Sequence, residues 1–481
     1  MTDQLSQPSG QGISRRDLLH GASVGIAASA AASLLPTFGH SQRPGQPTSS
    51  PVQAKPATLT PASMPKGFAK EEYPWRWQRV RALMKERNLD CLLAPAGTQD
   101  YPDEPDDVTY LTGGGGGWVV FPYDGKVTAI LARGDASGEN EAGVELRPDG
   151  RYPGILVSSN AEAGQWSPAL INILREKGLT GGRIGVVNLS GVPRNDEGTV
   201  SYTTLDRVIK ALPRARFESA TDVMIKAKVV RTPAEIAVME KADEVAEAGI
   251  KVLLENARPA VSLRELYFNM HEAMRAASGE TGSIAFSVGG GGGGSSRMLG
   301  SYSEPRLGPP PAERLLPSGQ MMREEVSGQV LGYRMQVMHA VYLGPRAPQE
   351  WNAAAEYCIE CFGKLLDFMR PGVTMKELND FYVSLLKAKG LEYDKDDSNV
   401  IFHMGDGPRM GPNRKEGKDL VLEENWVFHT VKPMVPFGPN PSTVHARNTA
   451  TYAQFGDGVL VTANGSRRLG KRKLEVLSLG A

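Results

Sequence analysis

The sequence has few cysteines and no net charge, and each of these features excludes a class of protein. The 481 residues include three cysteines, Cys91, Cys358 and Cys361, and an odd, small number does not make a disulfide framework. Net charge is absent, because 54 Lys and Arg residues balance 54 Asp and Glu residues, which argues against a nucleic-acid binder that works by charge alone. Hydrophobic residues make up 40% of the chain, as in ordinary globular proteins. The length allows two or three domains with sizeable cores.

The first forty residues have the features of an export signal. Residues 14–19 read SRRDLL, a twin-arginine pattern, and an Ala-rich apolar run follows over 18–35. The run is too short and too rich in Ala, Ser and Gly to form a convincing membrane span. We therefore predict a twin-arginine signal peptide over 1–40, with the export machinery as a partner and a periplasmic or extracellular location. A signal anchor that is never cleaved stays open. Residues 41–72 include a stretch rich in Pro, Ser, Gln and Thr and are expected to form a disordered linker.

From residue 73 the pattern becomes that of a folded chain. An α/β domain is predicted over 73–225 from three features. They are an apolar helical face near residue 77, the buried strand CLLAPAG and a hairpin around residues 123–126. A second domain is expected over 226–481. It opens with Thr232-Pro233-Ala234-Glu235, a helix start with proline in the first turn and Glu three residues after the Thr.

Residues 320–344 predict a hairpin of two apolar strands, QMMREEV and RMQVMHAVYLG, around a corner at Gly332-Tyr333. Here the chain resembles the creatinase/aminopeptidase P/prolidase family, which has the pita-bread fold. The order of elements over roughly 73–480, including the YLTG segment of the first domain, agrees with that family. The resemblance implies an α/β (α+β) fold class, with a creatinase-like N-terminal α/β domain and a C-terminal pita-bread domain. It also implies a homodimer.

The resemblance implies two divalent metals held by two aspartates, one histidine and two glutamates. The matching positions in this chain are Glu325, Gln336, His403, Lys432 and Gly456. The family's ligands carry four negative charges, whereas Glu325 and Lys432 sum to zero here. An ammonium group in a metal's coordination shell would repel the ion. We therefore expect no dinuclear metal centre and no cofactor, with Lys432 paired to Glu325.

The positions of the histidines bear on this expectation in two ways. A different metal site could use His339, His403 and His429. Alternation along strands places His339 and His429 on the faces opposite Gln336 and Lys432, so core or surface histidines are the other interpretation. The family also carries an active-site histidine ahead of the hairpin, and residues 287–319 contain none.

The polar residues that remain define the candidate site. His403, Glu325 and Lys432 are the candidate catalytic residues, with His403 as the base. Gln336, Asp406, Arg409 and Asp457 are the candidate substrate-binding residues. The other interpretation is a buried ion network left from an ancestral metal site. Three functions follow: a metal-independent hydrolase of C–N bonds in a small or peptide-like substrate, an Xaa-Pro aminopeptidase-type metallopeptidase, and a non-catalytic binding module. None of the three involves nucleic acid.

Overall fold

A computed structural model describes residues 67–96, 103–114, 117–131, 138–147, 166–192, 195–278, 280, 282–288, 298–299, 309–393, 400–405, 407, 409–412, 414–415, 417–437, 443–444 and 451–480. The predicted signal peptide and the predicted linker up to residue 66 lie outside these residues. The last residues of the expected linker already belong to the fold. Phe68 packs edge-on against Tyr333, with ring centroids 5.9 Å apart, and helix α2 begins at Glu72.

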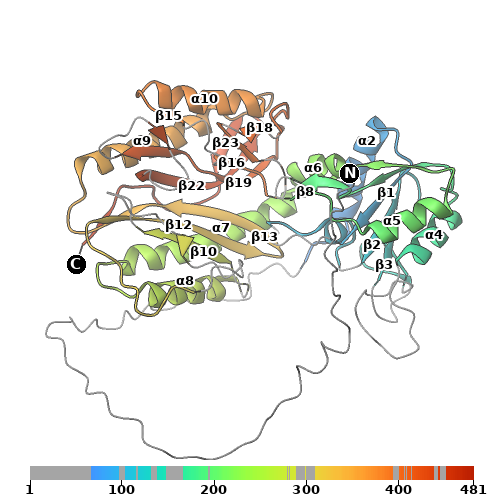
Figure 1. Ribbon diagram of the computed structural model, residues 1–481, viewed down its shortest axis with the longest axis horizontal. Helices are drawn as coiled ribbons and strands as arrows, with labels where there is room; N and C mark the ends of the chain where they lie inside the picture. Colours follow the sequence, from blue (N-terminus) through green and yellow to red (C-terminus); the bar gives the residue numbers. More distant parts are fainter. Residues whose placement is uncertain are drawn as a thin grey trace, which may run out of the picture. The chain divides into compact units, whose positions relative to one another are not determined.

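The N-terminal part forms a mixed sheet between two layers of helices (Figure 1). Strand β1 pairs antiparallel with β2 and parallel with β6. Its side chains alternate between two cores: Leu92 and Ala94 join residues of α2, α3 and α6, whereas Cys91 and Leu93 join residues of α4 and α5. The strands, in sheet order, are β4 Gly138–Glu139, β5 Glu145–Arg147, β3 Thr128–Ile130, β2 Trp118–Pro122, β1 Cys91–Pro95, β6 Arg183–Val186 and β9 Arg216–Ser219. The helices are α2 Glu72–Glu86, α3 Asp107–Thr112, α4 Ser167–Glu176, α5 Tyr202–Ala211 and α6 Thr221–Val229, and β7 Ser190–Val192 pairs with β8 Asn195–Glu197.

The C-terminal part is a large sheet packed against two helix pairs. Helix α7 packs on β12 and β13, while α9 packs on β20, β22 and β23 (Figure 1). Each pair has its own apolar core. The helices are α7 Pro233–Asn256, α8 Leu263–Ser278, α9 Gln349–Phe368 and α10 Met375–Lys387. The main path of the sheet is β11 Met298–Leu299, β10 Ser283–Val288, β12 Gln320–Val330, β13 Tyr333–His339, β22 Thr451–Thr462, β19 Val427–Val431, β16 Phe402–His403, β17 Arg409–Gly411 and β18 Arg414–Lys415. The remaining strands are β14 Val341–Leu343, β15 Glu392–Tyr393, β20 Met434–Phe437, β21 Thr443–Val444, β23 Gly465–Arg468 and β24 Ser478–Leu479. The two parts together confirm the predicted fold class.

The start of α7 follows from its first four residues, as the sequence predicts. Thr232 caps the helix by accepting a hydrogen bond from the Glu235 amide, and Glu235 accepts one from the Thr232 amide, both at 3.0 Å. This reciprocal pair satisfies two amide groups that a helix leaves without partners.

The predicted hairpin positions the candidate site. Strands β12 and β13 turn at Leu331 and Gly332, both with positive φ, and Ser327 lies opposite Gln336. Because side chains alternate along a strand, Glu325, Ser327 and Gln336 share one face of the sheet.

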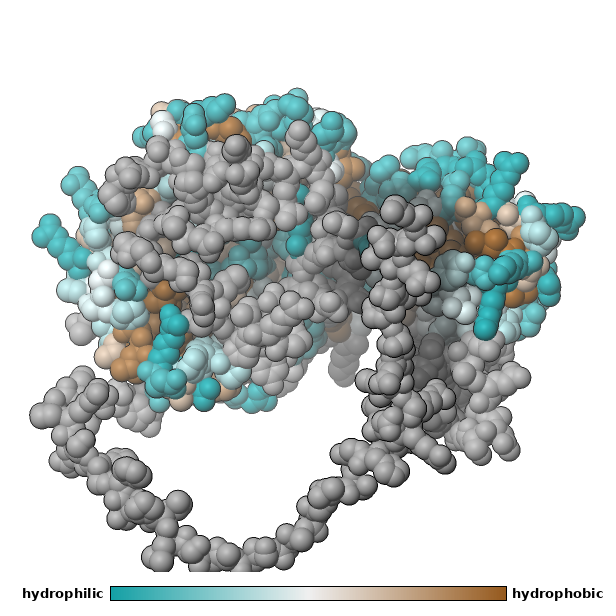
Figure 2. Space-filling view, viewed as in Figure 1, coloured by the Kyte–Doolittle hydropathy of each residue, from teal (hydrophilic) through white to brown (hydrophobic). Residues whose placement is uncertain are grey.

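The coloured surface that faces the viewer in Figure 2 is mainly polar. Within the described ranges, no helix is both long and apolar enough to cross a membrane.

Candidate functional site

Lys432, Glu325 and Gln336 form a closed triangle of polar contacts. The Lys432 ammonium Nζ donates to Glu325 Oε1 at 3.0 Å and to Gln336 Oε1 at 3.3 Å. The Gln336 amide Nε2 donates to Glu325 Oε2 at 3.4 Å. Lys432 follows β19, and its backbone amide donates to Ile401 at 2.9 Å, which fixes the start of its side chain. The predicted pairing of Lys432 with Glu325 is therefore present.

The charge on Lys432 controls the electrostatics of Glu325. Partial removal from water raises the pKa of the Glu325 carboxyl group. The Lys432 ammonium outweighs this effect, with smaller help from His403 and Arg323, and the pKa falls below its ordinary value. The Lys432 side chain is 11% exposed and that of Glu325 is 31% exposed, so the pair lies near water without being fully solvated.

Gly456 leaves no room for the acidic residue that the family resemblance implies there. A Cβ atom at this position would lie 2.8 Å from Lys432 Cβ, 2.8 Å from Met338 Sδ and 3.0 Å from the Val431 carbonyl oxygen. Any side chain at position 456 would therefore need the neighbouring residues, including the backbone at Val431, to shift.

The five positions do not fit a pair of divalent metal ions. They hold one carboxylate, Glu325, and it already contacts an ammonium group. Oxygen ligands with net negative charge are what divalent ions such as Mg²⁺ and Mn²⁺ need. Here the amide of Gln336 adds no charge, Gly456 adds no ligand, and Lys432 adds a positive charge.

His403 contacts an acidic residue that sequence reasoning missed. Its ring Nε2 lies 3.1 Å from Asp103 Oδ2, and Arg409 Nη2 lies 3.6 Å from the same oxygen. His403 and Arg409 are register partners on β16 and β17. The Arg334 amide donates to the Asp103 carbonyl at 2.9 Å, and its guanidinium lies 3.7 Å from Asp103 Oδ1. The predicted residues His403 and Arg409 are thus brought together by a carboxylate from the N-terminal part.

A buried ion pair supports this segment of the chain. Glu104 Oε2 lies 2.7 Å from Arg231 Nη1, and both side chains are almost fully buried. Burial alone would raise the pKa of the Glu104 carboxyl group. The positive charges of Arg231 and then Lys228 have the larger combined effect, so the pKa lies below its ordinary value. His429 lies beside this pair, where a Cβ at Gly405 would be 2.6 Å from His429 Nε2 and 2.8 Å from Glu104 Oε1.

The histidines of the alternative metal site do not gather at one point. The rings of His403 and His429 have centroids 6.1 Å apart, and burial lowers the pKa of His429 to about 3. His339 instead has its Nε2 3.1 Å from the Glu475 carbonyl oxygen and packs on Phe455. In the described ranges, His339, His403 and His429 do not form a group with ligand atoms within 4.8 Å of one another.

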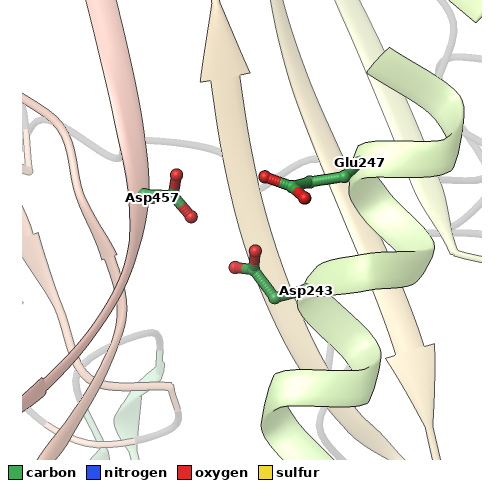
Figure 3. A group of neighbouring side chains, drawn as sticks. All are labelled: Asp243, Glu247 and Asp457. Carbon is green, nitrogen blue, oxygen red and sulfur yellow. The ribbon is translucent and has the colours of Figure 1, made fainter. Parts of the chain in front are cut away.

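Asp457 belongs to a separate acidic cluster, which does not support its expected role in substrate binding. It is fully buried beside Asp243 and Glu247 of α7, as Figure 3 shows, and Arg472 Nη1 lies 2.8 Å from its Oδ2. Ligand atoms of the three acids lie within 4.8 Å of one another. Burial raises the pKa of Asp243 well above its ordinary value, and the nearby Asp457 carboxyl group adds to this effect. Asp406, another expected substrate contact, lies outside the described residues.

The sequence held a weak signal for Asp103. It belongs to the acidic stretch 103–107, DEPDD, in which Asp106 caps α3 by accepting from the Thr109 amide at 2.8 Å. Such a stretch usually marks a solvated helix start, yet Asp103 and Glu104 are 3% and 2% exposed.

Comparisons with known proteins agree on one family. The pattern of the metallopeptidase family M24 matches residues 237–463, and that of the creatinase/prolidase N-terminal domain matches residues 76–230. An uncharacterised hydrolase/peptidase of Sinorhizobium fredii is 26% identical over 343 residues, covering 68% of this chain and 79% of its own length. An ectoine hydrolase of Halomonas elongata is 24% identical over 382 residues, covering 75% of this chain and 89% of its own.

A solved structure shows the same fold. The Xaa-Pro dipeptidase from Bacillus anthracis superposes with a TM-score of 0.62 at 16% identity, and the match covers 85% of this chain and 100% of that one. Together with the two domain patterns in the expected order, these matches place this chain in the creatinase/aminopeptidase P/prolidase family of pita-bread proteins.

Proposed function

We propose that this protein is a hydrolase that cleaves a C–N bond in a small or peptide-like substrate without the dinuclear metal centre of its family. One observation carries the proposal: the Lys432 ammonium lies 3.0 Å from the one carboxylate left at the five ligand positions. A relative named ectoine hydrolase supports a small-molecule substrate, and the Xaa-Pro dipeptidase fold supports a peptide-like one.

The proposed chemistry uses His403 as a general base. His403 takes a proton from a water molecule, whose oxygen attacks the carbon of the C–N bond. The same proton then passes to the leaving nitrogen as the bond breaks, so the reaction consumes one water and leaves His403 unchanged. Glu325, held ionised by Lys432, acts beside His403 as a hydrogen-bond acceptor for the water or the substrate. Lys432, Gln336 and Arg409 supply donors for a substrate carboxylate or for negative charge that develops on oxygen.

The first test measures bound metal and turnover together. Metal analysis of purified protein is expected to find no stoichiometric divalent metal. Turnover of a substrate panel that includes Xaa-Pro dipeptides and ectoine is expected to be insensitive to a chelator. Two tightly held ions per chain, or turnover that requires added Mn²⁺ or Co²⁺, would instead support the Xaa-Pro metallopeptidase.

The second test removes the base. His403→Ala is expected to abolish turnover, a loss of at least about 10²-fold for a general base, while the far-UV circular dichroism stays native. Unchanged turnover removes His403 from the mechanism. A thermal-shift response to a ligand without any turnover would identify a non-catalytic binding module.

We also propose that the protein acts as a homodimer after twin-arginine export. The residues that support export are Arg15 and Arg16. Replacing both with Lys should retain the protein in the cytoplasm, as cell fractionation would detect, and light scattering of the mature protein would test the dimer.

A further inference from the structure

We propose that Asp243, Glu247 and Asp457 form a buried site for one monovalent cation of about the size of Na⁺. Asp243 and Glu247 lie one turn apart on α7, and Asp457 lies on β22. Figure 3 shows their three carboxylate groups pointing toward one another. None of the three residues belongs to the five family ligand positions, so the site does not depend on the proposed function.

Three oxygen atoms of this cluster are buried without a partner. Asp243 is fully buried, and neither of its carboxylate oxygens has a hydrogen-bond partner among the described residues. Asp457 is fully buried as well, and its Oδ1 has no partner in the same part of the chain. Carboxylate oxygens that are removed from water in this way need a cation or a proton beside them.

The charges in contact leave one negative charge to be balanced. Arg472 Nη1 lies 2.8 Å from Asp457 Oδ2 and 3.3 Å from Glu247 Oε1. Arg468 Nε lies 3.4 Å from Asp457 Oδ2. Three carboxylates therefore face two guanidinium groups, and a single positive charge completes the balance, which favours a monovalent cation over a divalent one. Without such a cation, a proton on Asp243 supplies the same charge, so the two compete for the same oxygen atoms.

The dimensions of the cluster fit an ion of this size. Oxygen ligands hold Ca²⁺, which has nearly the radius of Na⁺, at about 2.3–2.6 Å, so two ligands of one ion lie at most about 5 Å apart. Ligand oxygens of the three acids lie within 4.8 Å of one another. A Cβ atom added to Gly470 would lie 2.5 Å from both carboxylate oxygens of Asp457 and 2.6 Å from Glu247 Oε1. Glycine at position 470 thus keeps a side chain out of the region where these oxygens converge.

The experiment titrates the purified protein with NaCl at constant pH and measures its melting temperature. N-methyl-D-glucamine chloride, whose cation is too large for the site, keeps the ionic strength constant, so that general screening does not change. Na⁺ is expected to raise the melting temperature in a saturable way, because an ion that binds the folded state alone stabilises it. A melting temperature that does not respond to Na⁺ overturns the proposal and shows that a proton alone balances the cluster. A response to Ca²⁺ with none to Na⁺ overturns the monovalent assignment.

Two pairs of variants locate the effect. Asp243→Asn removes one ligand charge and should weaken Na⁺ binding at least about 10-fold, since even residues that only support a metal ligand contribute that much. Asp419→Asn makes the same change at an exposed position and should keep the wild-type response. Gly470→Ala keeps every carboxylate but places a methyl group among them, so it should abolish the response. Gly465→Ala should not, because a Cβ there meets nothing within 4 Å. A wild-type response in Asp243→Asn overturns the proposal; if that variant does not fold, a wild-type response in Gly470→Ala does so.

Discussion

At the scale of single residues, the positive charge of Lys432 controls the electrostatics around Glu325. Lys432 places one positive charge beside Glu325, and this charge is part of the protein chain rather than a bound ion. Its ammonium contacts both the carboxylate and the amide of Gln336, so the three side chains satisfy one another. A chelator removes a bound ion, but it does not remove this charge.

Replacing Lys432 with Met tests this residue. The change leaves Glu325 without its cation, so we expect a loss of about 1–3 kcal/mol in the free energy of unfolding and a drop of about 10²-fold in kcat. Urea denaturation and steady-state kinetics measure the two effects. Lys473→Met is the control, because that lysine is 78% exposed and pairs with Glu475 at the surface. Equal effects of the two substitutions would contradict the assignment.

Asp243 gives a prediction about pH. Its pKa is raised in the folded protein, mainly by burial, so the folded state holds a proton that the unfolded chain has already released. The stability from this group is fully present below the unfolded pKa, about 3.9, and is lost as the pH rises through the folded pKa. Asp243→Asn removes the group, so the free energy of unfolding should fall less steeply with rising pH than in the wild type. Denaturation curves at a series of pH values measure the slopes, and Asp419→Asn, at an 83% exposed position, should leave the slope unchanged.

At the scale of elements, local chemistry made α7 and the β12–β13 hairpin predictable. The Thr232 cap, the proline after it and the Gly332 turn act within a few residues, so sequence alone contains them. The candidate site was predictable only in part. The contact between Asp103 and His403 joins two distant segments, and no local pattern marks it. Asp457 follows Gly456 on β22, so the alternation that separates His339 from Gln336 also places Asp457 on the face opposite Gly456.

The two capping boxes offer a matched pair of substitutions. Thr374 caps α10 near the surface and accepts from the Glu377 amide at 3.1 Å. Thr232 makes the same cap on α7, but it is buried and also donates to Glu72 of α2. Thr374→Ala is expected to lower the free energy of unfolding by about 1 kcal/mol. Thr232→Ala should cost about 2–3 kcal/mol, because a charged acceptor loses its donor as well. Chemical denaturation that gave equal losses would show that the bond to Glu72 contributes nothing.

At the scale of the whole molecule, buried charges connect the two sheet-containing parts. Arg231 precedes α7, while Glu104 follows β1, and their ion pair is shielded from water. Asp103 makes the neighbouring contact to His403, so the same short segment supports both the fold and the site. We therefore expect the two parts to unfold together.

Glu104→Gln tests this coupling. Breaking this buried pair leaves Arg231 with only the more distant Glu235 carboxylate, 3.6 Å away, and the expected loss is up to about 3–5 kcal/mol. Glu423→Gln is the control, because its pairing with Arg79 at 3.2 Å is half exposed and should contribute less than about 1 kcal/mol. Calorimetry should show one transition in the wild type and a lower melting temperature for Glu104→Gln alone. Two separate wild-type transitions would contradict the coupling.

The crowding around Gly456 has a consequence for the protein's history. A Cβ on this residue would lie 2.8 Å from the Lys432 Cβ and 3.0 Å from the Val431 carbonyl oxygen, so a glutamate can return there only if the chain around Val431 shifts. Replacing the lysine first, by glutamate, would set two like charges side by side with no cation between them. Each single step back toward the acidic residues of the family is therefore expected to pass through a less stable protein.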